Sequence, residues 1–185
     1  MGLKVNSVSE IPEHVAVGYY LYLLDYGWHE PLGEALRRNF DRIAGFTSKN
    51  NAAVIMGFGS EFNDSVLSWH GVNGNDGDEF LPALLITNKP PGFFLEHRGV
   101  WDKEQDHLIV IPLRRVCRDA TDVIGVIERI LNDIQAGRDL QNFQVAQQVR
   151  AGQSGALVDA VILQPNVAGI GVDLKRVFSW LRGGR

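Results

Sequence analysis

Few residues of this chain could carry out chemistry, and they are scattered. Cys117 is the only cysteine among the 185 residues, so the chain can form neither an internal disulfide nor a dithiol redox pair. A cysteine-based zinc cluster is excluded for the same reason. Cys117 precedes a charged turn and could be reactive, but a lone thiol beside an apolar run is more often a buried hydrophobic residue. We therefore expect Cys117 to be buried.

The pair His29-Glu30 precedes Pro31 and an amphipathic stretch. At a helix N-terminus this pair could transfer protons, or the free N–H groups of the helix could bind an anion. We favour the simpler interpretation, a surface histidine beside a glutamate that interacts favourably with the helix dipole. The remaining histidines lack metal-ligand spacing; they are His14, His70, His97 and His107. We predict no metal site and no cofactor.

Other glycine-rich and acidic stretches lack the full pattern of a known site. Residues 73–79 have the composition of a calcium loop, but the glycine falls at the wrong step for an EF-hand. Gly57-Phe58-Gly59 lacks the third glycine of a dinucleotide fingerprint. Neither a phosphate-binding P-loop nor the Gly-x-Ser-x-Gly element of serine hydrolases is present. We interpret these stretches as turns.

The charge is unevenly distributed along the chain. The net charge is −4, but residues 138–185 hold six basic and three acidic residues, which leaves 12 basic and 19 acidic residues in 1–137. An acidic body disfavours a nucleic-acid surface, because binding to phosphates needs clustered Lys and Arg. No apolar run approaches the ~20 residues that span a bilayer, and the N-terminus lacks a secretory signal. We expect a cytoplasmic protein that binds neither nucleic acid nor membrane.

Hydrophobic patterning predicts the elements that position these residues. Apolar, β-branched runs predict strands at 15–24, 52–58, 84–87 and 108–113. Apolar residues at helical spacing predict helices at 31–44, 60–69 and 119–136, the last with Asp119 as its cap. Strands that alternate with helices predict a mixed sheet with helices on both faces and one antiparallel pair among the last strands. The fold class is therefore α/β.

The sequence changes character after residue 137, so we expect a body at 1–137 and a C-terminal extension at 138–185. Residues 157–163 could form a strand or a helix, since so short a run does not decide between them. An amphipathic helix is predicted at 173–181. Its apolar face should dock on the body or on another chain, because nine residues are too few for a stable isolated helix. That face consists of Leu174, Val177, Phe178 and Leu181.

Two stretches resemble the thioredoxin family over roughly residues 12–137. Strand 15–24 followed by Trp28-His29-Glu30-Pro31-Leu32 is similar to the thioredoxin strand that leads into Trp-Cys-x-Pro-Cys at a helix N-terminus. Leu81-Pro82 and the apolar residues after it resemble the family's cis-proline and the strand that follows, which face the active site. The resemblance implies a thioredoxin-like mixed sheet flanked by helices, and a cis bond before Pro82.

This chain departs from the thioredoxin pattern at the reactive positions. His29 and Leu32 stand where the two cysteines would be, and disulfide exchange needs a thiolate with a second thiol beside it. The resemblance therefore implies a redox-inactive binding or assembly module of a bacterial-type cytoplasmic system, with a protein partner or a second copy. The binding residues would be Trp28, His29, Glu30, Pro82 and the apolar face of 173–181.

The alternative is an enzyme or small-ligand-binding protein that uses a cleft around His29 and Glu30, with Glu61 and Pro82. Apolar residues should dominate that cleft, which suits a partner better than a reaction; they are Leu32, Phe58, Phe62 and Leu81. The stretch Leu181-Arg182-Gly183-Gly184 also resembles the Leu-Arg-Gly-Gly end of ubiquitin. The rest of the chain does not resemble ubiquitin, so we interpret these glycines as a helix end.

Overall fold

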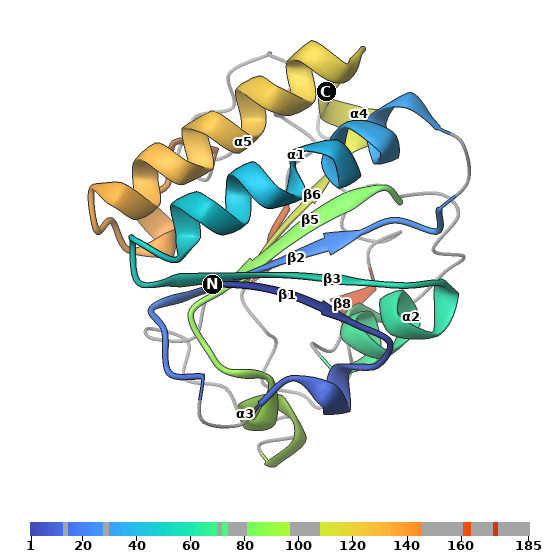
Figure 1. The fold of residues 1–185 in the computed structure, drawn as a ribbon, viewed down its shortest axis with the longest axis vertical. Helices are drawn as coiled ribbons and strands as arrows, with labels where there is room; N and C mark the ends of the chain where they lie inside the picture. The colour runs from blue at the N-terminus through green and yellow to red at the C-terminus, as the bar shows by residue number, and fades with distance from the viewer. Residues whose placement is uncertain are drawn as a thin grey trace.

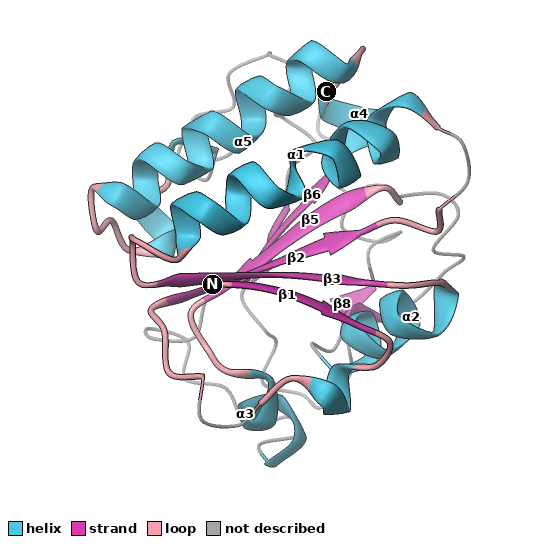
Figure 2. Cartoon of the chain, viewed as in Figure 1, coloured by secondary structure: helices cyan, strands magenta, loops and turns pink. Residues whose placement is uncertain are grey.

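The chain folds around a six-stranded mixed sheet with helices on both faces, as the computed structural model shows (Figure 1; Figure 2). The structure describes residues 1–12, 15–27, 30–69, 72–73, 81–96, 108–145, 161–163 and 172–173. The sheet strands are β1 (Gly2–Val5), β2 (Tyr19–Leu24), β3 (Ala52–Gly57), β5 (Ala83–Thr87), β6 (Leu108–Pro112) and β7 (Val161–Leu163). The longer helices are α1 (Pro31–Thr47), α2 (Ser60–Trp69) and α5 (Ala120–Gln135). The predicted α/β class is confirmed.

The strand order of the sheet is β1-β3-β2-β5-β6-β7. Strands β1, β3 and β2 are parallel, whereas β5 is antiparallel to β2, β6 to β5 and β7 to β6. In the central pair of strands, β2 and β5, Leu24 lies opposite Ala83. Because β5 runs against β2, the start of β5 lies at the same edge of the sheet as the ends of β2 and β3.

One face of the sheet is covered by the two long helices, α1 and α5 (Figure 1). Their apolar stripes pack on alternate strand residues, as the period of two along a strand requires. The most buried of these strand residues are Val54, Ile86, Ile109 and Ile111. The N-cap of α5 is Asp119, whose side chain accepts from the N–H groups of Thr121 and Asp122 at 2.7 and 3.1 Å. The predicted cap is confirmed.

The other face carries α2, the six-residue helix α3 (Pro91–Glu96) and the short 3-10 helix η1 (Val8–Glu10). A second core forms there from the remaining alternate residues of the strands, with Tyr22, Ile55, Leu85 and Val110 fully buried. Phe62 and Val66 of α2 belong to this core. The sheet is therefore buried on both faces, which explains the continuous apolar runs of its strands.

Several observed boundaries differ from the expected ones. The strand expected at 15–24 begins only at Tyr19, because the N–H groups of Val15 and Gly18 bond to Pro12 O and Asn51 O instead of to a neighbouring strand. Strand β6 ends at Pro112, after which the four-residue helix α4 (Leu113–Val116) begins. Strand β1 was not predicted from Gly2-Leu-Lys-Val, since four residues with little apolar patterning carry a weak strand signal.

The C-terminal extension returns to the body in two places. Strand β7 pairs with β6, which decides in favour of a strand for the end of the ambiguous run 157–163. Strand β8 (Val172–Asp173) pairs with β4 (Val72–Asn73), so Asp173 lies in a strand. Residues 174–181 of the expected helix lie outside the described residues. Leu140, Phe143 and Val145 belong to the first core, so that core continues past the expected boundary at residue 137.

Candidate functional site at the strand ends

The candidate site lies at the edge of the sheet where β2, β3 and β6 end and β5 begins. We call this edge the strand-end surface, and it contains Glu30, Phe58, Glu61, Pro82 and Arg114. Glu30 precedes α1, Phe58 follows β3, Glu61 is in the first turn of α2, Pro82 precedes β5, and Arg114 is in α4. Residues separated by more than 80 positions in the sequence are thus brought together by the strand order.

Glu30 and Arg114 form a two-pronged ion pair across this surface. Arg114 donates from Nε to Glu30 Oε1 at 2.8 Å and from a terminal nitrogen to Oε2 at 2.7 Å. The side chains are 22% and 38% exposed, respectively. This fork geometry fixes the orientation of both side chains. Glu30 occupies the N-cap position of α1 but makes no capping hydrogen bond with its side chain, so its carboxylate serves Arg114 rather than the helix.

Pro82, directly before β5, is buried. The Leu81–Pro82 peptide bond is cis, as the resemblance implied. The Pro82 carbonyl accepts from the N–H of Leu113 at 2.9 Å, and Leu113 directly precedes Arg114. The start of β5 and the start of α4 are therefore joined, and Pro82 helps to place Arg114 opposite Glu30.

The inner wall of the strand-end surface is made by Asp25, just after β2. Its side chain is 10% exposed and pairs with Arg37 of α1. Gly33 lies against this carboxylate, because a Cβ atom at position 33 would be 2.5 Å from Asp25 Oδ1. Asn63 of α2 accepts from the Asp25 N–H at 3.2 Å and donates to the Asp25 carbonyl at 3.0 Å. The loop that leaves β2 is thus fastened to both α1 and α2.

Phe58 is exposed on this surface, between β3 and α2. With 59% of its surface accessible, it is the one exposed large apolar side chain among the residues whose burial the structure describes. Beside it, Glu61 and Asp64 are exposed on α2, and Asp64 accepts from the Tyr26 hydroxyl at 3.1 Å. The strand-end surface thus combines an aromatic side chain with carboxylates.

Glu30, Glu61 and Pro82 lie at one edge of the sheet. Trp28 and His29, and likewise Leu174, Val177, Phe178 and Leu181, lie outside the described residues. The expectation that Leu32, Phe62 and Leu81 line the cleft is wrong, because all three are buried: Leu32 in the first core, and Phe62 and Leu81 in the second. Phe58 is the exception in this group.

Cys117 is buried near the start of α5, as expected. Burial raises the pKa of its thiol to about 12, and Asp122 and Asp119 add to the increase, while Arg129 opposes it. A thiol with this pKa is almost fully protonated near neutral pH and is a poor nucleophile. Cys117 is therefore a core residue rather than a reactive one.

The residues that sequence reasoning missed are Arg114, Asp25 and Asn63. Arg114 follows the predicted strand 108–113, and an antiparallel arrangement of the last two strands would have placed it near Pro82. The two α2–loop bonds of Asn63 have no signal in the sequence, since they depend on how α2 packs against the end of β2.

A shallow hollow of about 430 Å³ lies elsewhere, between α1 and α5. It is lined at the C-terminal halves of both helices by Arg42, Phe46, Lys49, Glu128 and Leu131, among others. Arg42 and Glu128 pair with each other at 2.7 Å across it. None of the described residues that line this hollow is an exposed large apolar side chain, so the strand-end surface, which exposes Phe58, is the stronger candidate.

Comparisons with protein-family models, curated proteins and solved structures give no match. Among the helices of the described residues, none combines the length and apolar character that a membrane crossing requires. The same residues contain no group of three His, Cys, Asp or Glu side chains arranged to hold a metal ion.

Proposed function

We propose that this chain is a thioredoxin-like protein-binding module that acts through the strand-end surface and not through dithiol chemistry. The resemblance to thioredoxins rests on two stretches of sequence, and their proximity in the fold supports this proposal. The turn from β2 into α1 and the cis proline before β5 meet at one edge, with Leu24 opposite Ala83. Binding sites in α/β proteins commonly lie at the carboxyl ends of strands.

The absence of dithiol chemistry follows from the residue types at the reactive positions. Leu32, at the position of the second thioredoxin cysteine, is 8% exposed and belongs to the first core. The single thiol of the chain, Cys117, is buried and has a raised pKa. The proposed module therefore keeps a scaffold of the thioredoxin type and uses it for contact.

The observation that carries the binding role is the exposure of Phe58 on a surface that also holds the fixed ion pair of Glu30 and Arg114. Large aromatic side chains are enriched at protein interfaces, because they bury a large apolar area on contact. The neighbouring pair Glu30–Arg114 is held by two hydrogen bonds, which lowers the entropy lost when a partner binds. We propose that the partner is a protein of a bacterial-type cytoplasmic system or a second copy of this chain.

The alternative, an enzyme that uses His29 and Glu30, is less well supported. Both carboxylate oxygens of Glu30 already accept hydrogen bonds from Arg114. A general base needs a carboxylate oxygen within hydrogen-bond reach of the substrate proton that it removes, whereas the Glu30 oxygens face Arg114. We therefore do not propose a catalytic role for Glu30.

Site-specific photo-crosslinking in the native host tests the proposal. A photoreactive residue in place of Phe58 should give discrete protein adducts, whereas the same residue at Asp139, on the opposite end of the molecule, should give none. Equal adducts from both positions, or none from position 58, would contradict a strand-end interface. Separately, the purified chain should not reduce the disulfides of insulin. Turnover that persists in Cys117→Ser would mean that reduction proceeds without a thiol, and would overturn the assignment.

A further inference from the structure

We infer that Phe58 anchors a basic protein segment, whose Arg or Lys side chains lie over the Phe58 ring and against the carboxylates of α2. This inference rests on the proposed function, because it assigns the chemistry of the partner at the same surface. Three observations carry it: the rigid presentation of Phe58, the charges around it, and the commitment of the neighbouring cations.

The turn that presents Phe58 is fixed on both sides. At position 57 a Cβ atom would lie 1.8 Å from Cγ of Phe62, so the Phe62 ring packs directly on the glycine backbone. Gly59 has a φ of +88°, a conformation that favours glycine, and its carbonyl accepts from Asn63 Nδ2 at 3.0 Å. The Phe58 N–H donates to the Val5 carbonyl at 3.2 Å. The phenyl ring is therefore exposed from a rigid turn.

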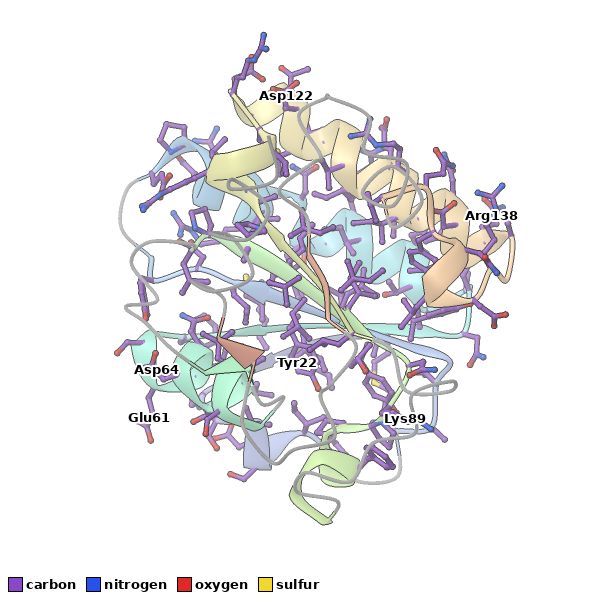
Figure 3. All side chains as sticks on the ribbon, turned by 180° about the vertical axis from the view of Figure 1, so that it is seen from behind. Tyr22, Glu61, Asp64, Lys89, Asp122 and Arg138 are labelled. Atoms are coloured by element: carbon purple, nitrogen blue, oxygen red, sulfur yellow. The ribbon has the colours of Figure 1, made fainter. Side chains whose placement is uncertain are left out.

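The described charged side chains of α2 and η1, the elements beside Phe58, are acidic. Residues 52–69 contain Glu61 and Asp64 and no basic residue. Figure 3 shows the side chains of Glu61 and Asp64 directed outward from α2. Glu10 is exposed in η1, the element beside α2. An acidic surface attracts cations and repels phosphate groups, which favours a basic protein segment over a nucleic acid.

Among the described residues, the cations Arg37, Arg114 and Lys4 are already bound elsewhere. Arg37 pairs with the buried Asp25, and Arg114 pairs with Glu30. Lys4 of β1 turns to the α1 side, where its ammonium group lies 4.7 Å from the centre of the Phe40 ring. Neither Glu61 nor Asp64 has an ion pair with a described residue. A cation supplied by a partner could contact the face of Phe58 and these carboxylates together.

Peptide titration followed by NMR tests this inference on the full chain. Two synthetic peptides of equal length and apolar content are compared, one rich in Arg and the other with Glu at the same positions. The Arg peptide should shift the amide signals of Phe58, Glu61 and Asp64, and salt should weaken its binding. Phe58→Ser should lower its affinity about tenfold. Glu61→Gln with Asp64→Asn should lower the affinity by about three- to tenfold and reduce the salt dependence.

Asp139→Asn is the matched control, because it removes an exposed carboxylate at the opposite end of the molecule. It should leave the affinity for the Arg peptide unchanged. Dispersed NMR spectra of all variants establish that they fold. Equal binding of both peptides, shifts confined to other elements, or unchanged affinity of Phe58→Ser would overturn the inference.

The two proposals fail in different ways. Adducts from position 58 without Arg-peptide binding would overturn the basic partner and leave the binding module intact. Arg-peptide binding without any adduct in the host would contradict the binding module alone. Adducts from position 58 to the chain's own basic residues 174–185 would show that an intramolecular segment occupies the surface, and would overturn the foreign partner.

Discussion

The two ends of the sheet differ in how completely their ion-paired carboxylates are buried. At the end opposite the strand-end surface, the Asp133 carboxylate of α5 is completely buried. It accepts from the Arg138 guanidinium, from the Gln144 N–H at 2.7 Å and from the Gln144 side chain at 3.2 Å. Tyr19, the first residue of β2, donates to the Arg138 carbonyl at 2.6 Å. This network fastens residues 138–145 to the body.

At the strand ends, by contrast, the ion pair of Glu30 and Arg114 is partly exposed, and Phe58, Glu61 and Asp64 are left in contact with solvent. A fully buried carboxylate must be satisfied within the chain, since an unpaired one is costly. The exposed carboxylates of Glu61 and Asp64 have no such requirement and can bind a partner. The comparison indicates that the first end stabilises the fold and the second presents a surface.

The largest effect is expected at the buried end. Asp133→Ala should lower the free energy of unfolding by about 3 kcal/mol, because it removes the shared acceptor of three hydrogen bonds and leaves a space in the core. Urea denaturation of the purified chain measures this change. Asp139→Asn, an exposed neighbour without a side-chain capping bond, should change stability by less than about 0.5 kcal/mol. Similar effects at both positions would contradict the structural role of Asp133.

A smaller effect is expected where the strand-end surface meets its scaffold. Gly33→Ala should destabilise the chain by about 1–3 kcal/mol, because the new methyl group would collide with the Asp25 carboxylate. Gly45 lies in the same helix with nothing within 4 Å of its Cβ position. Gly45→Ala should therefore stabilise the chain by about 0.5–1 kcal/mol. Thermal unfolding measures both variants. If Asp25 is held against Gly33, the melting temperature should fall in Gly33→Ala and rise in Gly45→Ala.

The stability of the chain at high pH tests whether the Cys117 thiol is buried. The pKa of Cys117 is raised to about 12, whereas an unfolded thiol titrates near ~8.5. Above the unfolded pKa only the unfolded chain loses this proton, so stability should fall as the pH rises from about 9 towards 12. The fall should be shallower in Cys117→Ala. Equal slopes from denaturation at several pH values would contradict the burial of the thiol.

The smallest effect on stability is expected from the ion pair at the strand ends. Glu30→Gln and Arg114→Gln should each cost less than about 1 kcal/mol, as is usual for partly exposed pairs. A double-mutant cycle on unfolding free energies isolates their interaction. A coupling energy as large as the effect of Asp133→Ala would erase the distinction between the two ends.

Helices whose apolar residues repeat regularly over several turns were predictable from the sequence, whereas contacts between distant loops were not. The stripes of α1 and α5 predicted both helices, and Asp119 predicted the start of α5. Glu30 and Pro82 were predicted at the site through a resemblance. Arg114 was missed, because its role depends on the antiparallel return of β6. Phe58 was predicted in the cleft, but its exposure depends on Phe62 filling the space above Gly57, which no local pattern encodes.

The pairing of β7 with β6 has a consequence for synthesis of the chain. Among the described residues, the strand that pairs with the outer side of residues 108–110 is 161–163, so the ribosome must extend the chain well past α5 before this edge is covered. Until then an apolar strand exposes its backbone to other nascent chains, and such edges promote aggregation. The late strand thus protects the newly made protein, and a chain whose translation stops before residue 161 would depend on chaperones to stay soluble.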